Sequence, residues 1–308
     1  MTAFGRFVRP RNRRPLVEWL RMSHPALPRI ESAMAGARAA RLQGEMAQMH
    51  TQLVHALDAL AEVTRDGMVP VREDAPTHWD REAAARLMWQ LLARLKSEGC
   101  HVFPYGGTLL GMERDGELMP HDKDLDLGVW LEDFSLAGRL LQNWGLQRVR
   151  DVPPFGNMSR WTEASTGLAV DLYGMLRDPV RERIQGGLSL YGRPPEWQRV
   201  LVLPWFDLAE RPGPVGTVWW PDPPEVMLRG FYGDWRTPRA DWDTRISNRS
   251  LNDVNLSWHC WALQALCDRW VTGDLASTLR LLETIAMRSG DTAQLRGWRE
   301  ALAPSAPR

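Results

Sequence analysis

Two aspartates separated by one leucine, Asp124 and Asp126, have the residue types and spacing that most clearly predict chemistry in this chain. Side chains of a β-strand point alternately to opposite faces, so both carboxylates would share one face and Leu125 would lie on the other. Two like charges side by side repel each other unless a positive charge lies between them. Mg²⁺ often has this role, because one or two carboxylates and the phosphates of a substrate typically hold it.

A glycine turn precedes this pair of aspartates. Gly106 and Gly107 follow a short apolar run at residues 101–105, which predicts a strand. A backbone without Cβ atoms can approach a phosphate closely and direct its N–H groups at it. A glycine turn, a short helix and then a strand with Asp-x-Asp, in this order, predict a site for metal-dependent phosphoryl or nucleotidyl transfer.

The same stretch resembles the LicD/fukutin family, whose nucleotidyltransferase fold is shared with the polymerase-β superfamily. The resemblance starts with Gly-Gly-Thr-Leu-Leu-Gly at residues 106–111 and continues through Arg114, Gly116, Pro120 and the Asp-x-Asp pair. His121 stands where many bacterial members have Trp, and Lys123 replaces an acidic residue, which brings the stretch closer to the fukutin branch. A looser match at residues 231–238, which we interpret as packing in a substrate domain, extends the resemblance over residues 85–245.

Asp171 is charged in the middle of an otherwise apolar run at residues 168–176, which predicts a strand. A buried charge requires a partner. One interpretation is an ion pair with Arg160 or Arg177. We favour the other, in which Asp171 is the third carboxylate of a metal triad, because the superfamily supplies such a residue from a later strand.

The resemblance implies an α/β (α+β) fold, with a nucleotidyltransferase-like core in which helices flank a mixed β-sheet. It also implies that Mg²⁺ or Mn²⁺ is held by the catalytic residues Asp124, Asp126 and Asp171. The expected substrate-binding residues are Gly106, Gly107 and Thr108, which would seat a phosphate, and Arg114 and Lys123, which would neutralise its charge. Asp171 is also expected to accept the proton of the attacking hydroxyl.

The function implied by the resemblance is transfer of a phospho-substituted group, such as phosphocholine or ribitol phosphate, from a CDP-linked donor. The acceptor would be a hydroxyl of a cell-surface glycan or glycolipid, as in lipopolysaccharide or capsule biosynthesis. One alternative is a nucleotidyltransferase that moves a nucleoside monophosphate from a triphosphate to a small molecule or protein. The other is a non-catalytic scaffold that binds a glycan or a synthase.

Composition excludes several other classes of function. The formal net charge is zero and the pI is near 7.1, so no overall electrostatic attraction to nucleic acid is expected. No apolar run is long enough for a transmembrane helix, and the N-terminus lacks the apolar region of a secretory signal. Three cysteines without metal-binding spacing indicate reduced, structural thiols. We expect a cytoplasmic protein, with peripheral binding at the inner face of the membrane as an alternative.

The organisation predicted for the whole chain has four parts. Residues 1–29 form a flexible basic tail, residues 30–66 one long helix, residues 80–245 the catalytic domain, and residues 246–308 a helical region. The long helix carries a heptad seam made of Leu42, Met46, Met49, Leu53, Ala56, Leu60 and Val63. This seam favours equally a coiled coil, which would form a homodimer or bind a complex, and a helix that packs on its own catalytic domain.

Overall fold

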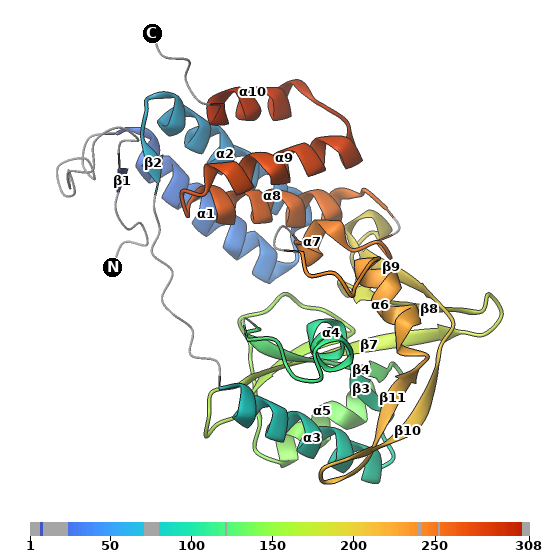
Figure 1. Cartoon of the computed structure of the whole chain (residues 1–308). Coiled ribbons are helices and arrows are strands. Elements are labelled where there is room, and N and C mark those ends of the chain that lie inside the picture. The colour runs from blue at the N-terminus through green and yellow to red at the C-terminus, as the bar shows by residue number, and fades with distance from the viewer. Residues whose placement is uncertain are drawn as a thin grey trace. The chain divides into compact units, whose positions relative to one another are not determined.

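The computed structural model describes residues 7–8, 24–70, 80–120, 122–239, 242–251 and 253–303. Most of the tail predicted at residues 1–29, and His121, lie outside these residues. The chain divides into two compact units, one formed by Thr77–Asp253 and the other by Met1–Pro76 together with Val254–Arg308. Figure 1 shows the elements of both units.

The unit formed by Thr77–Asp253 is built on a seven-stranded mixed sheet, in which the strand order is β3-β4-β7-β6-β5 and β8 and β9 extend from β7. β4 and β7 are parallel, whereas the other pairs are antiparallel. The strands are β3 (Val102–Pro104), β4 (Asp124–Trp130), β5 (Gln147–Arg148), β6 (Met158–Thr162), β7 (Ala169–Asp178), β8 (Arg183–Leu188) and β9 (Arg199–Pro204).

Helices and a separate hairpin complete this unit, and the mixed sheet with flanking helices confirms the predicted fold class. The hairpin consists of β10 (Asp207–Gly213) and β11 (Gly216–Asp222). The helices are α3 (Arg81–Ser97), α4 (Gly106–Arg114), α5 (Phe134–Asn143), α6 (Pro224–Tyr232) and the short α7 (Thr244–Ser247), with a 3₁₀ turn at Pro195–Trp197.

Local sequence signals explain where α3 begins and ends. The side chain of Asp80 accepts a hydrogen bond from the backbone N–H of Ala83 at 3.0 Å, which satisfies one of the donors left free at a helix start. Gly99 has a φ of +83°, a left-handed conformation that glycine adopts readily and that ends a helix. The chain then enters β3, which leads directly to the glycine turn.

The second unit consists mainly of α1 (Ala26–Gln43), α2 (Met46–Arg65), α8 (Leu256–Trp270), α9 (Leu275–Ser289) and α10 (Ala293–Leu302), with the short strands β1 (Phe7–Val8) and β2 (Val69–Pro70). The prediction of one long helix at residues 30–66 is therefore wrong. The helix is interrupted because Gly44 adopts a left-handed conformation, with φ at 71° and ψ at 24°. The two halves pack against each other as a helical hairpin.

The predicted heptad seam is used inside this helical unit. Its members from Met46 to Val63 are buried in the structure. Three polar contacts accompany this packing: Trp270 Nε1 donates to Thr64 Oγ1 at 3.0 Å, Trp298 Nε1 donates to Asp58 Oδ1 at 2.8 Å, and Arg65 Nη2 donates to the carbonyl of Gly297 at 2.9 Å. The seam therefore packs on the chain's own C-terminal helices. Neither of the two predicted arrangements included this packing. Because the seam is buried, it no longer supports a homodimer through residues 30–66.

Two smaller features agree with the sequence. Among the described residues, no helix is both long and apolar enough to cross a membrane. Cys100, Cys260 and Cys267 are all free and buried, as expected of structural thiols.

Candidate active site

Strand β4 presents the two aspartates as the alternation predicts. Leu125 and Leu127 are fully buried on one side of the strand, whereas Asp124 and Asp126 on the other side are partly accessible. A strand can expose two residues in this way because its side chains alternate with period two. The two carboxylates consequently share one face of the sheet.

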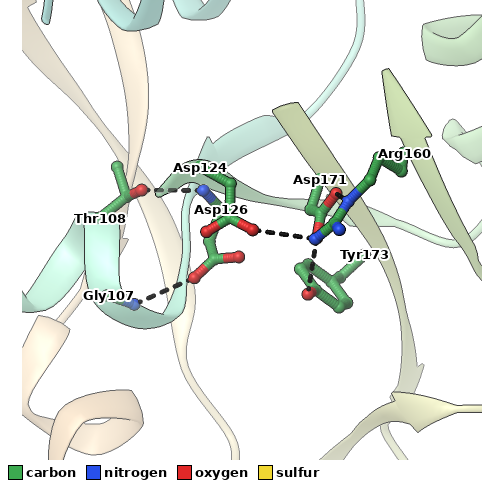
Figure 2. Close-up of polar contacts among 7 residues, drawn as sticks. All are labelled: Gly107, Thr108, Asp124, Asp126, Arg160, Asp171 and Tyr173. Carbon is green, nitrogen blue, oxygen red and sulfur yellow. Dashed lines mark hydrogen bonds and ion pairs between the residues drawn. The ribbon is translucent and has the colours of Figure 1, made fainter. Parts of the chain in front are cut away.

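Asp171 on β7 lies beside this pair. β4 and β7 are parallel, and their register places Asp171 opposite Asp126. Asp171 is only 1% exposed, so its carboxylate is almost completely removed from solvent. The structure therefore brings the three aspartates predicted from the sequence into one cluster, which Figure 2 shows.

Arg160 supplies the positive charge in this cluster. It lies on β6, where the antiparallel register places it opposite Asp171. Its Nε donates to Asp171 Oδ1 at 2.6 Å, and its Nη2 donates to Asp171 Oδ2 at 2.5 Å and to Asp124 Oδ2 at 2.8 Å (Figure 2). The ion pair between Asp171 and Arg160, one of our two interpretations of Asp171, is thus present. Arg177, the other residue considered, pairs with Glu132 instead.

The glycine turn holds Asp126 from the side opposite to Arg160 in Figure 2. The N–H of Gly107, in the first turn of α4, donates to Asp126 Oδ2 at 3.2 Å, and the N–H of Asp126 donates to Thr108 Oγ1 at 2.8 Å. Gly106 has a φ of +52°, and a Cβ atom there would lie 2.8 Å from Asp126 Oδ2. The expected phosphate seat therefore holds the carboxylate of Asp126 directly, at a helix N-terminus that favours negative charge.

Electrostatics in the cluster disfavour a full set of ionised carboxylates. Burial raises the pKa of Asp126 well above its ordinary value, and the charges of Asp124 and Asp171 raise it further, against the opposing effect of the Gly107 N–H. The pKa of Asp124 is also raised, by burial and by Asp171, although Arg160 and Lys123 oppose the shift. The site thus has more negative charge than its own arginine compensates.

The residues fit a divalent cation held in part by a substrate. No three His, Cys, Asp or Glu side chains in the described ranges come together as a complete metal-binding group. Asp124 and Asp126 nevertheless offer carboxylate oxygens on one face, which is the donor chemistry that Mg²⁺ uses when phosphates complete its coordination. The metal assignment stays a prediction, with these two aspartates as the ligands that Arg160 leaves most available.

The two cations predicted to bind phosphate have different surroundings. Arg114, in the last turn of α4, donates two hydrogen bonds to Asp115, Nε to Oδ1 at 2.9 Å and Nη2 to Oδ2 at 2.8 Å. This contact is the main reason why the pKa of Arg114 is raised. Lys123 is exposed immediately before β4, where its charge acts on Asp124. Lys123 is therefore the more accessible of the two.

Aromatic residues also lie beside the carboxylates, and the sequence alone did not identify them as part of the site. Tyr105 stacks on Tyr173 with ring centroids 4.9 Å apart, and Phe231 meets Tyr105 edge-on at 5.1 Å. The Tyr173 hydroxyl donates to Asp171 Oδ2 at 3.3 Å. Burial and the charge of Asp126 raise the pKa values of Tyr105 and Tyr232. Two features of the sequence could have indicated this. Tyr105 directly precedes the glycine pair, and Tyr173 follows Asp171 by two residues.

A family model matches the segment that contains the carboxylate cluster. Residues 99–173 match the family model described as LicD/FKTN/FKRP, nucleotidyltransferase domain. Over 56 residues the chain is 43% identical to an uncharacterized protein of Caenorhabditis elegans, W02B3.4, and the matched stretch spans 17% of this chain and only 14% of that protein. The crystal structure of ANT(2″)-Ia in complex with adenylyl-2″-tobramycin is similar with a TM-score of 0.33 and 14% sequence identity, over 59% of this chain and 98% of that chain.

Proposed function

We propose that the chain is a metal-dependent phosphotransferase of the LicD/FKTN/FKRP family, whose nucleotidyltransferase-domain model matches residues 99–173. In this proposal it moves a phospho-substituted group, such as phosphocholine or ribitol phosphate, from a CDP-linked donor. The acceptor is a hydroxyl of a cell-surface glycan or glycolipid, modified on the cytoplasmic side. The family resemblance supports the donor and acceptor classes.

The observation that carries the proposal is the cluster of Asp124, Asp126 and Asp171 beside the N-terminus of α4. Two paired strands supply the carboxylates, and the register of β4 with β7 sets Asp126 against Asp171. The mutual repulsion of these carboxylates makes the folded state less stable. Clusters of carboxylates with such a cost are typical of functional sites. Excess negative charge next to a glycine turn is the arrangement expected of a site that receives a cation and a phosphate together.

The protein's own residues have distinct roles in the proposed reaction. Asp124 and Asp126 would hold Mg²⁺ or Mn²⁺, and Asp171 completes the carboxylate set. A cation held there would supply positive charge against the donor diphosphate. Gly107 and Thr108 keep Asp126 in position through the hydrogen bonds described above. Lys123 attracts the anionic donor from its exposed position, and Arg114 adds positive charge at the far end of α4.

The first test is CMP release from CDP-choline, CDP-ribitol, CDP-glycerol and CDP-ethanolamine, with Mg²⁺ or Mn²⁺ present or removed by EDTA. Slow hydrolysis of the donor can replace transfer while the acceptor is unidentified. We expect one donor to give metal-dependent CMP and the Asp126→Asn variant to give none. Release that continues in EDTA, or in this variant, would disprove the proposed role of the cluster.

A nucleotidyltransferase is the second candidate, favoured by the name of the matched domain. It would use the same carboxylates but would release pyrophosphate from a nucleoside triphosphate. The two functions are therefore separated by their products. Pyrophosphate from ATP or CTP, with no CMP from the four donors, would replace our proposal with this one.

A further inference from the structure

The contacts of Arg160 occupy oxygens that a second metal ion would need. Both oxygens of Asp171 and one oxygen of Asp124 accept hydrogen bonds from its guanidinium group. Asp126 instead accepts from the N–H of Gly107. The cluster thus has one end closed by Arg160 and another end, at Asp126 and the remaining oxygen of Asp124, where a cation can bind.

We propose that Arg160 takes the place of a second divalent cation, so that this site binds a single metal ion. This inference rests on the proposed metal-dependent function and specifies how its active site is charged. Asp171 then acts as a positioning residue that holds Arg160, and it contributes its negative charge to the cluster without binding the metal directly.

The backbone keeps Arg160 where it is. Antiparallel pairing of β6 with β7 sets Arg160 opposite Asp171, so the side chains are neighbours whether or not a ligand is present. The two groups form a fork in which Nε and Nη2 each meet a different carboxylate oxygen. Such bidentate pairs are stronger and more directional than single contacts, and an arginine does not lose its charge at any ordinary pH.

Burial makes displacement of Arg160 expensive. The side chain of Asp171 is 2% exposed, whereas that of Arg160 is 38% exposed. If a second metal ion pushed the guanidinium away, the arginine would lose its partner while the metal had to give up water to reach a buried carboxylate. Mg²⁺ loses its water ligands reluctantly. The open end of the cluster is therefore the easier site for a divalent ion.

The charges in the cluster agree with a single metal ion. Asp124, Asp126 and Asp171 face one guanidinium, and the nearby charges of Asp122 and Lys123 are opposite in sign, so one divalent ion balances the negative charge that remains. Arg160 differs from a metal ion in that it is always present. The protein would then need only one metal ion to become active, and a titration with metal would show a single class of binding site.

Counting bound Mn²⁺ by electron paramagnetic resonance tests the inference with the metal alone, without donor or acceptor. The whole chain of 308 residues is titrated with Mn²⁺ as wild type, Arg160→Ala, Arg160→Gln and Arg177→Ala. Gln is neutral but keeps an N–H donor for Asp171, which protects folding if the Ala variant is unstable. Arg177→Ala is the matched control, because Arg177 also lies on this sheet and pairs with a carboxylate, Glu132, outside the cluster.

We expect wild type and Arg177→Ala to bind one Mn²⁺ per chain, and the two Arg160 variants to bind two. Two ions in the wild type would overturn the inference while leaving the metal-dependent function intact. One ion in Arg160 variants that keep native circular dichroism would also overturn it. No bound Mn²⁺ in any of the proteins, even after CDP is added to supply phosphate ligands, would instead contradict the proposed function itself, and the inference with it.

Discussion

Asp126 and Asp171 stand opposite each other where the parallel strands β4 and β7 pair. Neighbouring strands lie about 4.8 Å apart, so two carboxylates at paired positions are forced close together. Arg160 compensates for Asp171 through two hydrogen bonds, whereas among the described residues Asp126 accepts a hydrogen bond from the Gly107 N–H at the start of α4. The two carboxylates thus have different partners although they occupy paired positions on adjacent strands.

This difference predicts that Asp126 lowers the free energy of unfolding of the metal-free protein. The pKa of its carboxyl group is raised in the folded chain above the ordinary value of 3.8. Ionised Asp126 therefore makes the folded state less stable at neutral pH, and this destabilisation disappears as the pH falls to 3.8. We expect Asp126→Asn in EDTA at neutral pH to be more stable than wild type, with a Tm higher by about 2–4 °C for each 1 kcal/mol gained. Mn²⁺ should raise the Tm of wild type but not that of the variant.

Asp207→Asn is a suitable control, because Asp207 is exposed at the start of β10 and its side chain accepts from the Trp205 indole N–H. It should leave both measurements unchanged. A lower Tm of Asp126→Asn in EDTA would mean that the contact with Gly107 outweighs the repulsion, contrary to our account.

Gly106 allows the carboxylate of Asp126 to lie against the start of α4. In Gly106→Ala the new Cβ would meet Asp126 Oδ2 at 2.8 Å, so the carboxylate must move. We expect the CMP-release rate to fall by about a hundredfold, the typical result when a reacting group is displaced by about 1 Å. Gly116→Ala is the matched control, since Gly116 also has a positive φ, +74°, but no atom of the described residues lies within 4 Å of its Cβ position. Equal losses of activity in the two variants would show that backbone strain, and not the contact with Asp126, is responsible.

The glycine turn and the Asp-x-Asp strand could be predicted because their signals are local. Alternation in β4 is a property of seven consecutive residues, and the end of α3 depends on Gly99 alone. Asp171 was found because a charge in an apolar strand requires a partner. The choice between its two interpretations was not local, since the contact with Arg160 depends on the register between β6 and β7.

Elements that depend on distant parts of the chain were harder to predict. Strand β8 contains Gly186 and Gly187, which suggest a loop, yet Gly187 pairs with Val200 on β9. A Cβ atom at Gly187 would lie 1.8 Å from the carbonyl oxygen of Arg199, so the glycine is there because another backbone approaches closely. The heptad seam likewise suggested one continuous helix, because the sequence pattern does not reveal that Gly44 reverses the chain and that α8 and α10 cover α2.

Burial of the seam predicts a loss of stability that does not depend on dimerisation. Leu53 in α2 is fully buried, and Leu53→Ala should cost about 2–5 kcal/mol in the unfolding of the helical unit. Thr51→Ala, at an exposed position of the same helix, should have little effect. The measurement is urea unfolding at several protein concentrations. A midpoint that rises with protein concentration, and loses this dependence in Leu53→Ala, would restore the seam as a dimer interface.

The pair formed by His50 on α2 and His259 on α8 predicts that stability falls in mild acid. The two rings meet edge-on with centroids 6.2 Å apart. Burial lowers the pKa of both residues, and the charge of His50 lowers that of His259 further. Both histidines have pKa values below 6.5 in the folded chain, so just below pH 6.5 the unfolded chain binds more protons than the folded chain. The stability that is present above pH 6.5 is therefore lost as the pH falls.

Thermal unfolding at about pH 7.5 and about pH 5.5 measures this effect. The difference in Tm between the two pH values should become smaller in His259→Gln, because glutamine keeps a polar side chain of similar size but does not bind a proton. His55→Gln, at an exposed position on α2, should leave the difference as it is in wild type. If His55→Gln reduces the difference as much as His259→Gln, or if neither variant changes it, then contact between α2 and α8 at the histidine pair is not what makes the protein sensitive to acid.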